Sequence, residues 1–230
     1  MLPIRDHIPT RRAALVTYAI LGISVLVFIF ELLLDGAGEL SAFLTSWGVV
    51  PARLLGNFSI SEALTLVTSM FLHDGPMHII GNMLYLWIFS DNVEDMMGRG
   101  RFALFYLLCG IAASMAQVLA GVGSTIPAIG ASGAIAGVLG AYLLLFPNAR
   151  VDTLVTWSFF VRIRTLPAIV VLGFWFVLQF LNSVLSFGVG QVGGVAWFAH
   201  IGGFLFGLLT VKLFVPRGRR PPEPRRKRYL

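Results

Sequence analysis

The segment TIPAIGASGAIAGVLGAYLLLFP, residues 125–147, is built mostly from apolar and small side chains and holds a single serine, Ser132. This serine lies between Ala131 and Gly133, and Gly130 comes just before them. A hydroxyl group in an apolar environment either finds a hydrogen-bond partner or is kept for chemistry. Two questions follow from this segment. The fold class depends on whether the segment crosses a membrane, and the role of Ser132 depends on which other polar groups lie at the same depth in that membrane.

The composition indicates a membrane protein. Hydrophobic residues make up 57% of the 230 residues and charged residues 12%, and the mean hydropathy is +0.84. These values lie far to the apolar side of a soluble protein. The chain holds six apolar runs, each close to the ~20 residues that cross a ~30 Å hydrocarbon core. These runs are roughly 13–34, 77–97, 102–121, 131–147, 166–187 and 197–215. The sequence therefore predicts an all-α, polytopic membrane protein with a bundle of six transmembrane helices.

The basic residues predict the orientation of this bundle. Short loops rich in Lys and Arg face the cytoplasm. If the N-terminus is cytoplasmic, only Arg53 of the seventeen basic residues falls on the outer side. The first apolar run is long and lacks a clear small-x-small cleavage site, so we expect it to remain as a helix. The predicted parts are a cytoplasmic N-terminal segment (1–12), a six-helix membrane domain (13–215) and a basic, proline-rich cytoplasmic tail (216–230). We expect both termini in the cytoplasm.

The cysteine count and the tail limit the remaining functions. Cys109 is the only cysteine, which excludes an intramolecular disulfide and a thiolate metal site, and its simplest interpretation is a small buried side chain. We expect no metal and no other cofactor. The net charge of +6 comes largely from RGRRPPEPRRKRYL, residues 217–230. Next to a membrane span, such a tail indicates a topology signal and contact with anionic lipid rather than with nucleic acid.

Polar residues on three spans are expected at one depth. The second, fourth and sixth spans run in the same direction, from the outer face inward. Ser132 precedes Arg150 by 18 residues and His200 precedes Arg217 by 17, which is about 26 Å of helix in each case. On the second span, His78 and Asn82 are four residues apart and share one helix face. These four polar side chains should therefore lie together in the outer part of the bilayer.

Glycines predict that these helices pack closely. Gly203 and Gly207 follow His200 by three and seven residues, with the small-xxx-small spacing that lets helix backbones approach in lipid. Gly130 and Gly133 lie beside Ser132, and the glycine before it would let a substrate backbone come near. A hydrogen bond between Ser132 and His200 is then geometrically reasonable.

Each polar residue also has a structural interpretation. A serine in a membrane helix most often bonds to a carbonyl one turn earlier, and a histidine there can be a proton relay or a contact between helices. Asn82 can tie helices together. The shared depth and the close-packing faces favour a joint role instead, because a serine with a histidine suggests a nucleophile and its base.

The predicted chemistry is that of a catalytic dyad. The carboxylates considered as partners of His200 are expected at the cytoplasmic end (Asp91, Glu94, Asp95 and Asp152) or in the first outer loop (Glu39, Glu62 and Asp74), so none of these is expected beside it. His200 would accept the Ser132 proton and return it to the leaving amine. The Ser132 backbone N–H, the Asn82 amide and the His78 ring would donate hydrogen bonds to the oxyanion.

At these residues the chain resembles the rhomboid family of intramembrane serine proteases. The matching pieces are HIIGN (78–82), DNVEDMMG (91–98, with Glu94 in the usual acidic place), GASG (130–133) and AHIGGFLFG (199–207). The resemblance covers about residues 13–215 and is to the simple six-helix bacterial type, which implies a bacterial plasma membrane as the location. It implies a dyad of Ser132 and His200, a water-accessible cavity that opens outward, a fifth helix able to move aside, and membrane-spanning protein substrates. The tryptophan–arginine pair of many members is absent from the first outer loop, where Leu64 and Thr65 stand approximately in its place.

Two other functions fit part of the pattern. A catalytically silent rhomboid-like protein would bind membrane clients without cutting them, but such proteins typically lack the serine or the histidine. A small transporter would also have glycine-interrupted helices with polar residues. No inverted repeat is visible in the sequence, and the polar residues gather toward the outer face. We therefore expect an intramembrane serine endopeptidase.

Overall fold

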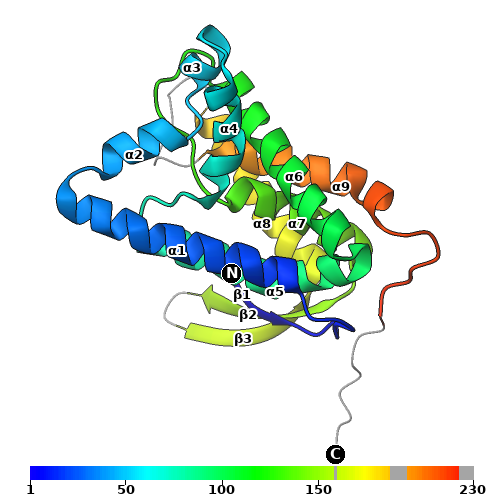
Figure 1. Ribbon diagram of the computed structural model, residues 1–230. Helices are drawn as coiled ribbons and strands as arrows, with labels where there is room; N and C mark the ends of the chain where they lie inside the picture. Colours follow the sequence, from blue (N-terminus) through cyan, green and yellow to red (C-terminus); the bar gives the residue numbers. More distant parts are fainter. Residues whose placement is uncertain (158–159, 187–195, 223–230) are drawn as a thin grey trace, which may run out of the picture.

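Six long helices form a bundle in the computed structural model, which describes residues 1–157, 160–186 and 196–222 (Figure 1). The helices are α1 Leu15–Ala37, α5 Pro76–Met97, α6 Arg99–Ala120, α7 Ser132–Leu145, α8 Ala168–Ser186 and α9 Trp197–Phe214. Among the described residues, α1, α6, α8 and α9 are long and apolar enough to cross a membrane. The α7 helix has 14 residues, and α5 carries several polar side chains. The prediction of a helical, polytopic membrane fold is confirmed.

The α7 helix forms the centre of the bundle. It packs against α5, α6, α8 and α9, and all of its residues from Gly133 to Tyr142 are buried. Its apolar side chains are spread around the whole helix, which is the pattern of a helix buried on all sides. The core therefore surrounds the helix that begins with Ser132.

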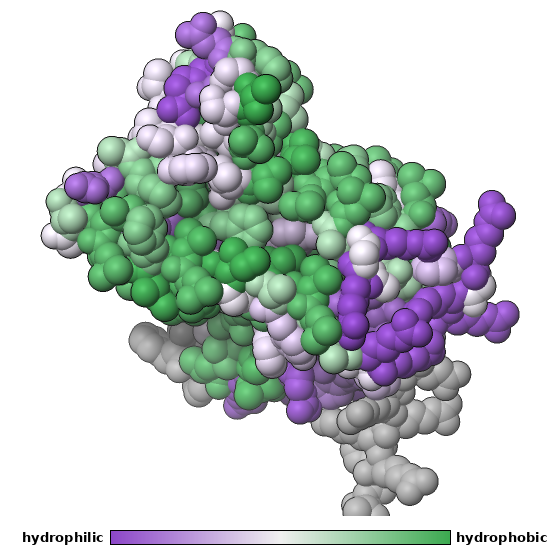
Figure 2. All heavy atoms as spheres, in the orientation of Figure 1, coloured by the Kyte–Doolittle hydropathy of each residue, from purple (hydrophilic) through white to green (hydrophobic). Residues whose placement is uncertain are grey.

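The outer surface of the bundle is apolar. Large aliphatic side chains such as Leu26 and Leu33 of α1 and Leu209 and Leu213 of α9 are exposed. Figure 2 shows hydrophobic side chains over α1 and its neighbours, whereas hydrophilic side chains gather at the end of the bundle where the C-terminal segment leaves α9. A helix bundle with an apolar exterior and a charged end fits a bilayer as its solvent.

An acidic cluster at the end of α5 holds the start of α1. Ala14, at the N-cap of α1, offers no side-chain cap. Glu94 supplies one from a distance, because its carboxylate accepts hydrogen bonds from Val16 N at 3.1 Å, from Thr17 N at 2.8 Å and from Thr17 Oγ1 at 2.8 Å. The first N–H groups of a helix lack acceptors within it, so this carboxylate stabilises the N-terminus of α1.

The neighbouring Asp95 connects both ends of the chain to the bundle. It accepts a hydrogen bond from Arg11 N at 3.2 Å and forms an ion pair with the Arg219 guanidinium at 3.1 Å. The Asp95 side chain is 3% exposed, so the cation compensates an almost fully buried charge. Of the predicted tail 216–230, residues 223–230 lie outside the described residues.

A three-stranded antiparallel sheet accompanies the bundle and was not predicted. It consists of β1 Leu2–Asp6, β2 Arg150–Trp157 and β3 Phe160–Pro167, in the order β1-β2-β3. In Figure 1 this sheet lies along one side of the bundle, beside α1 and α5. The short segment between α7 and α8 thus forms a hairpin, and the N-terminal segment adds the third strand.

Asp6 at the end of β1 joins the sheet to two bundle helices. Its Oδ2 accepts hydrogen bonds from Tyr142 Oη of α7 at 2.6 Å and from Asn92 Nδ2 of α5 at 3.1 Å. Burial raises the pKa of Asp6 to about 7, and the hydrogen bond from Tyr142 only partly offsets this. The fold therefore places a titratable carboxyl between the two helices that carry Ser132, His78 and Asn82.

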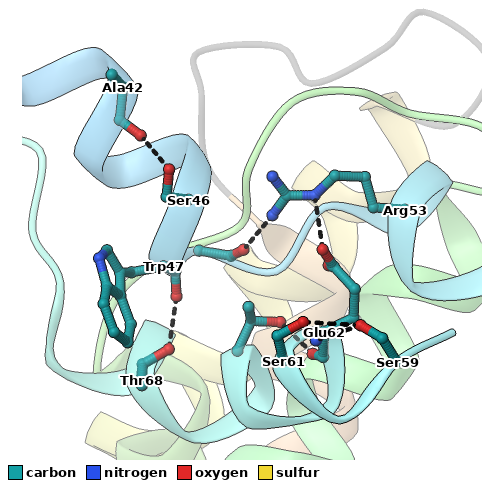
Figure 3. A network of polar contacts seen from close by, with 10 residues as sticks. Ala42, Ser46, Trp47, Arg53, Ser59, Ser61, Glu62 and Thr68 are labelled. Carbon is teal, nitrogen blue, oxygen red and sulfur yellow. Dashed lines mark hydrogen bonds and ion pairs between the residues drawn. The ribbon is translucent and has the colours of Figure 1, made fainter. Parts of the chain in front are cut away.

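The segment between α1 and α5, which is the predicted first outer loop, has a folded structure of its own. It contains α2 Leu40–Trp47, α3 Pro51–Gly56, α4 Ile60–Thr68 and the 3₁₀-helix η1 Ser69–Phe71. Figure 3 shows its polar contacts: Arg53 Nε lies 3.3 Å from Glu62 Oε1, and Thr68 Oγ1 donates to Trp47 O at 2.7 Å. These contacts join α2, α3 and α4.

Candidate active site

Ser132 and His200 form a hydrogen bond between two helices. Ser132 is the first residue of α7, and His200 lies near the start of α9. Ser132 Oγ and His200 Nε2 are 2.7 Å apart, and His200 is 8% exposed. The hydrogen bond expected from the sequence is present, so a hydroxyl contacts the ring nitrogen that could remove its proton.

The turn before α7 requires Gly130. Its φ of +115° lies in a region that L side chains rarely adopt, and its N–H donates to Ser69 O at 2.8 Å. A Cβ at this position would lie 2.7 Å from His78 Nε2, too close for an ordinary contact. The first N–H groups of a helix have no acceptor within it. Gly130 therefore lets the chain turn beside His78 and start α7 at Ser132.

Glycines bring α7 and α9 into backbone contact. A Cβ at Gly203 would overlap the carbonyl oxygen of Gly133, and a Cβ at Gly207 would overlap that of Gly137. Gly133 itself faces Ala113 of α6, whose Cβ would lie 2.6 Å from an added Cβ. Two helices that meet without intervening side chains can hold a short serine side chain against a histidine ring.

His200 makes a second hydrogen bond, with Gln179 of α8. Its Nδ1 lies 2.7 Å from Gln179 Oε1, and Gln179 is 9% exposed. The ring also packs near Trp175 of α8, at a centroid distance of 5.8 Å, and near Trp197 of its own helix at 6.1 Å. Sequence reasoning missed Gln179. The available signal was an amide in an apolar run, one helical turn after a tryptophan.

His78 and Asn82 of α5 lie beside the turn that precedes Ser132. An added Cβ at Gly130 would be 2.7 Å from His78 Nε2 and 3.7 Å from Asn82 Nδ2, so both nitrogens border the turn before Ser132. Asn82 Nδ2 is buried and has no hydrogen-bond partner among the described residues, while His78 Nδ1 contacts Asp74 Oδ1 at 2.6 Å. A buried amide without a partner is costly, so its donor group is available to a ligand.

These polar groups line one cavity of about 680 Å³. Ser132, His200, His78 and Asn82 all contribute to its wall. Its remaining lining is mainly apolar and includes Trp175 of α8 and side chains of the segment before α7. That segment is tied to the first outer loop, because Val49 and Ala128 exchange two backbone hydrogen bonds. The cavity thus lies on the side of the bundle that carries the outer loop, and it is large enough to admit a peptide segment.

A buried carboxylate of α1, Glu31, is linked to the site through His73 and His78. Glu31 is 1% exposed, and its two oxygens accept hydrogen bonds from His73 N at 3.1 and 3.2 Å. The His73 ring packs edge-on against His78, with the ring centroids 5.1 Å apart. Burial, and then the neighbouring His78, lowers the pKa of His73 to about 4, so this ring is neutral near pH 7. Sequence reasoning did not single out Glu31.

One cavity between apolar helices thus brings together a serine hydroxyl, a histidine ring and an amide without a partner among the described residues. Serine hydrolases use groups of these kinds. The Rhomboid domain family model matches residues 61–217, most of the chain, and these residues include all four polar groups of the site. The chain belongs to the rhomboid family.

Similar proteins support this assignment. The chain is 34% identical over 192 residues to "Rhomboid protease GluP" of Bacillus subtilis, covering 82% of this chain and 33% of that protein. It is 31% identical over 202 residues to "Rhomboid protein 1, mitochondrial" of Saccharomyces cerevisiae, covering 84% of this chain and 51% of that protein. The chain thus spans a third to about half of the length of these relatives. It is an integral, multi-pass membrane protein of an intramembrane-protease family. The bacterial plasma membrane and the cytoplasmic termini stay predictions.

Proposed function

We propose that this protein is an intramembrane serine endopeptidase that cleaves membrane-spanning proteins in or near their transmembrane segments. The observation that carries this proposal is the 2.7 Å contact between Ser132 Oγ and His200 Nε2 in the wall of the cavity. A nucleophile and a base within hydrogen-bond reach of each other, beside a space for substrate, are what acyl transfer requires. The family and the bacterial relative named as a protease agree with this chemistry.

In the proposed reaction, His200 Nε2 takes the proton from Ser132 as its oxygen attacks the carbonyl carbon of the scissile peptide. The bond from carbon to Ser132 Oγ forms while the carbonyl oxygen becomes an oxyanion. His200 then gives its proton to the leaving amine, and the peptide bond breaks. A water molecule attacks the resulting ester through the same proton transfers and releases the acid product and free Ser132.

Three donors support the oxyanion in this proposal: the Ser132 N–H, Asn82 Nδ2 and the His78 ring. Asn82 Nδ2 is buried, unpartnered and beside the turn that precedes Ser132. Because the Asp74 carboxylate accepts from His78 Nδ1, the His78 ring donates from Nε2 when it is doubly protonated. Such donors act on charge that develops in the transition state.

Labelling with a fluorophosphonate probe tests the proposal, because the probe reacts with activated serines. We expect an adduct on Ser132 in the wild-type protein, none in Ser132→Ala, and strongly reduced labelling in His200→Ala. Ser24→Ala is a matched control, since Ser24 is a buried serine of α1 without a partner among the described residues, and it should label like the wild type. A folded wild-type protein that does not react would contradict the proposal and favour a silent, client-binding member of the family.

A further inference from the structure

The α8 helix contributes two side chains to the environment of His200. Gln179 Oε1 contacts His200 Nδ1 at 2.7 Å, and the Trp175 ring lies one helical turn before it, 5.8 Å from the His200 ring. Gln179 and His200 are both almost fully buried. The two side chains lie on one face of α8, since residues four apart are neighbours on a helix.

The Gln179 contact decides which nitrogen of His200 carries the proton. An amide oxygen only accepts hydrogen bonds, so Nδ1 must be the N–H donor toward it. A neutral imidazole has a single N–H, and Nε2 is then left as the acceptor for the Ser132 hydroxyl. The opposite amide orientation would present N–H to Nδ1, place the ring proton on Nε2 and leave Ser132 without a base.

We propose that Gln179 is a positioning residue that fixes the tautomer and the ring orientation of His200, so that the dyad is ready to react only while α8 is packed against α9. This inference rests on the proposed function, because it assigns a role in the same site. Gln179 does not touch the reacting atoms and acts through His200.

Packing supports the dependence on α8. Near the dyad, α8 meets α9 through Trp175, Gln179 and Phe176, whose ring stacks on Phe204 at a centroid distance of 4.5 Å. The other faces of α8 are exposed, with Phe174, Val177 and Leu181 among their side chains. The acceptor of His200 Nδ1 therefore sits in a narrow strip of contact, and a displacement of α8 from α9 would remove it.

Three variants test the proposal. Gln179→Met keeps the size of the side chain but removes the acceptor, and Gln179→Glu keeps an acceptor. Gln117→Met is the matched control: Gln117 of α6 is also buried beside α9, but its Oε1 accepts from Ala199 N at 3.3 Å and not from the ring. ¹⁵N NMR of histidine-labelled protein reports the tautomer, and the His200 signal is assigned from its loss in His200→Ala. Fluorophosphonate labelling reports the rate at Ser132.

We expect His200 to carry its proton on Nδ1 in the wild type, Gln179→Glu and Gln117→Met, and to show a mixture of tautomers in Gln179→Met. Labelling should fall roughly tenfold in Gln179→Met, the loss of one buried hydrogen bond, and recover to within a few-fold of wild type in Gln179→Glu. Gln117→Met should lower the melting temperature without changing the tautomer.

A Gln179→Met protein with the wild-type tautomer and labelling rate would overturn the positioning role, as would a wild type with the proton on Nε2. So would a Gln179→Glu variant that is folded but as slow as Gln179→Met. A wild-type protein that never labels contradicts the proposed function instead, and the tautomer measurement still decides the role of Gln179 in that case.

Discussion

Replacing Gly203 with alanine should increase the distance between α7, which carries Ser132, and α9, which carries His200. A Cβ at this position would overlap the carbonyl oxygen of Gly133, and it would also lie 3.3 Å from Ala113 Cβ. The Gly133 oxygen belongs to a helix backbone and cannot rotate away as a flexible side chain could. The methyl group is therefore accommodated only if α9 moves away from α7.

The size of the effect follows from this overlap. Ordinary van der Waals contact is restored only after the helices separate by about 1 Å or more. Overpacking of this kind costs about 1–3 kcal/mol of stability. A displacement near 1 Å at reacting groups reduces the rate by roughly a hundredfold, because the 2.7 Å contact between Ser132 Oγ and His200 Nε2 would be lost. We expect both losses in Gly203→Ala.

Thermal unfolding in detergent and probe labelling of the folded fraction measure the two losses separately. Gly22→Ala of α1 is the matched control, since an added Cβ there meets nothing within 4 Å, and it should match the wild type in both assays. A Gly203→Ala protein with wild-type melting temperature and wild-type labelling would refute the packing of α7 and α9 through this face.

Three further substitutions and one deletion test other parts of the account. Asn82→Ala removes one oxyanion donor and should slow cleavage by about a hundredfold in a steady-state assay of the folded protein. This corresponds to the lower end of the 2.7–4 kcal/mol typical of such donors. The melting temperature should stay near that of the wild type. Burial raises the pKa of Asp6 to about 7, so its contribution to stability is complete below about pH 4 and is lost as the pH rises through about 7. Asp6→Asn should therefore show a smaller fall in melting temperature between pH 5 and pH 8 than the wild type does. Arg219→Ala leaves the buried Asp95 without its cation and should lower the melting temperature, whereas deletion of residues 220–230 should leave melting and labelling unchanged.

Much of this arrangement could be predicted because it follows from one-dimensional rules. Hydropathy and helix length located the six helices, since a bilayer requires long apolar runs. Residue spacing along spans of the same direction gave the common depth of Ser132 and His200, and the glycine spacing gave the close approach at Gly203 and Gly207. The roles of these side chains in catalysis remain predictions, which the variants above test.

The parts that the sequence did not reveal depend on helix rotation and on contacts across the chain. Gln179 is one amide in an apolar helix, and only the rotation of α8 shows that it faces His200. Glu31 similarly meets His73 across the bundle. The strands β2 and β3 were missed because their alternating pattern, as in Val161 to Arg164, is short and lies between two helices, where the basic residues were interpreted only as a topology signal.

Cleavage of a single-span protein in liposomes, with the products identified by mass spectrometry, tests the central claim most directly. The purified wild-type protein should cut the substrate in or near its transmembrane segment, and Ser132→Ala should cut nothing while melting like the wild type. Undiminished cleavage by a folded Ser132→Ala protein would contradict the account, because the scissile bond would then be broken without the serine that His200 contacts at 2.7 Å.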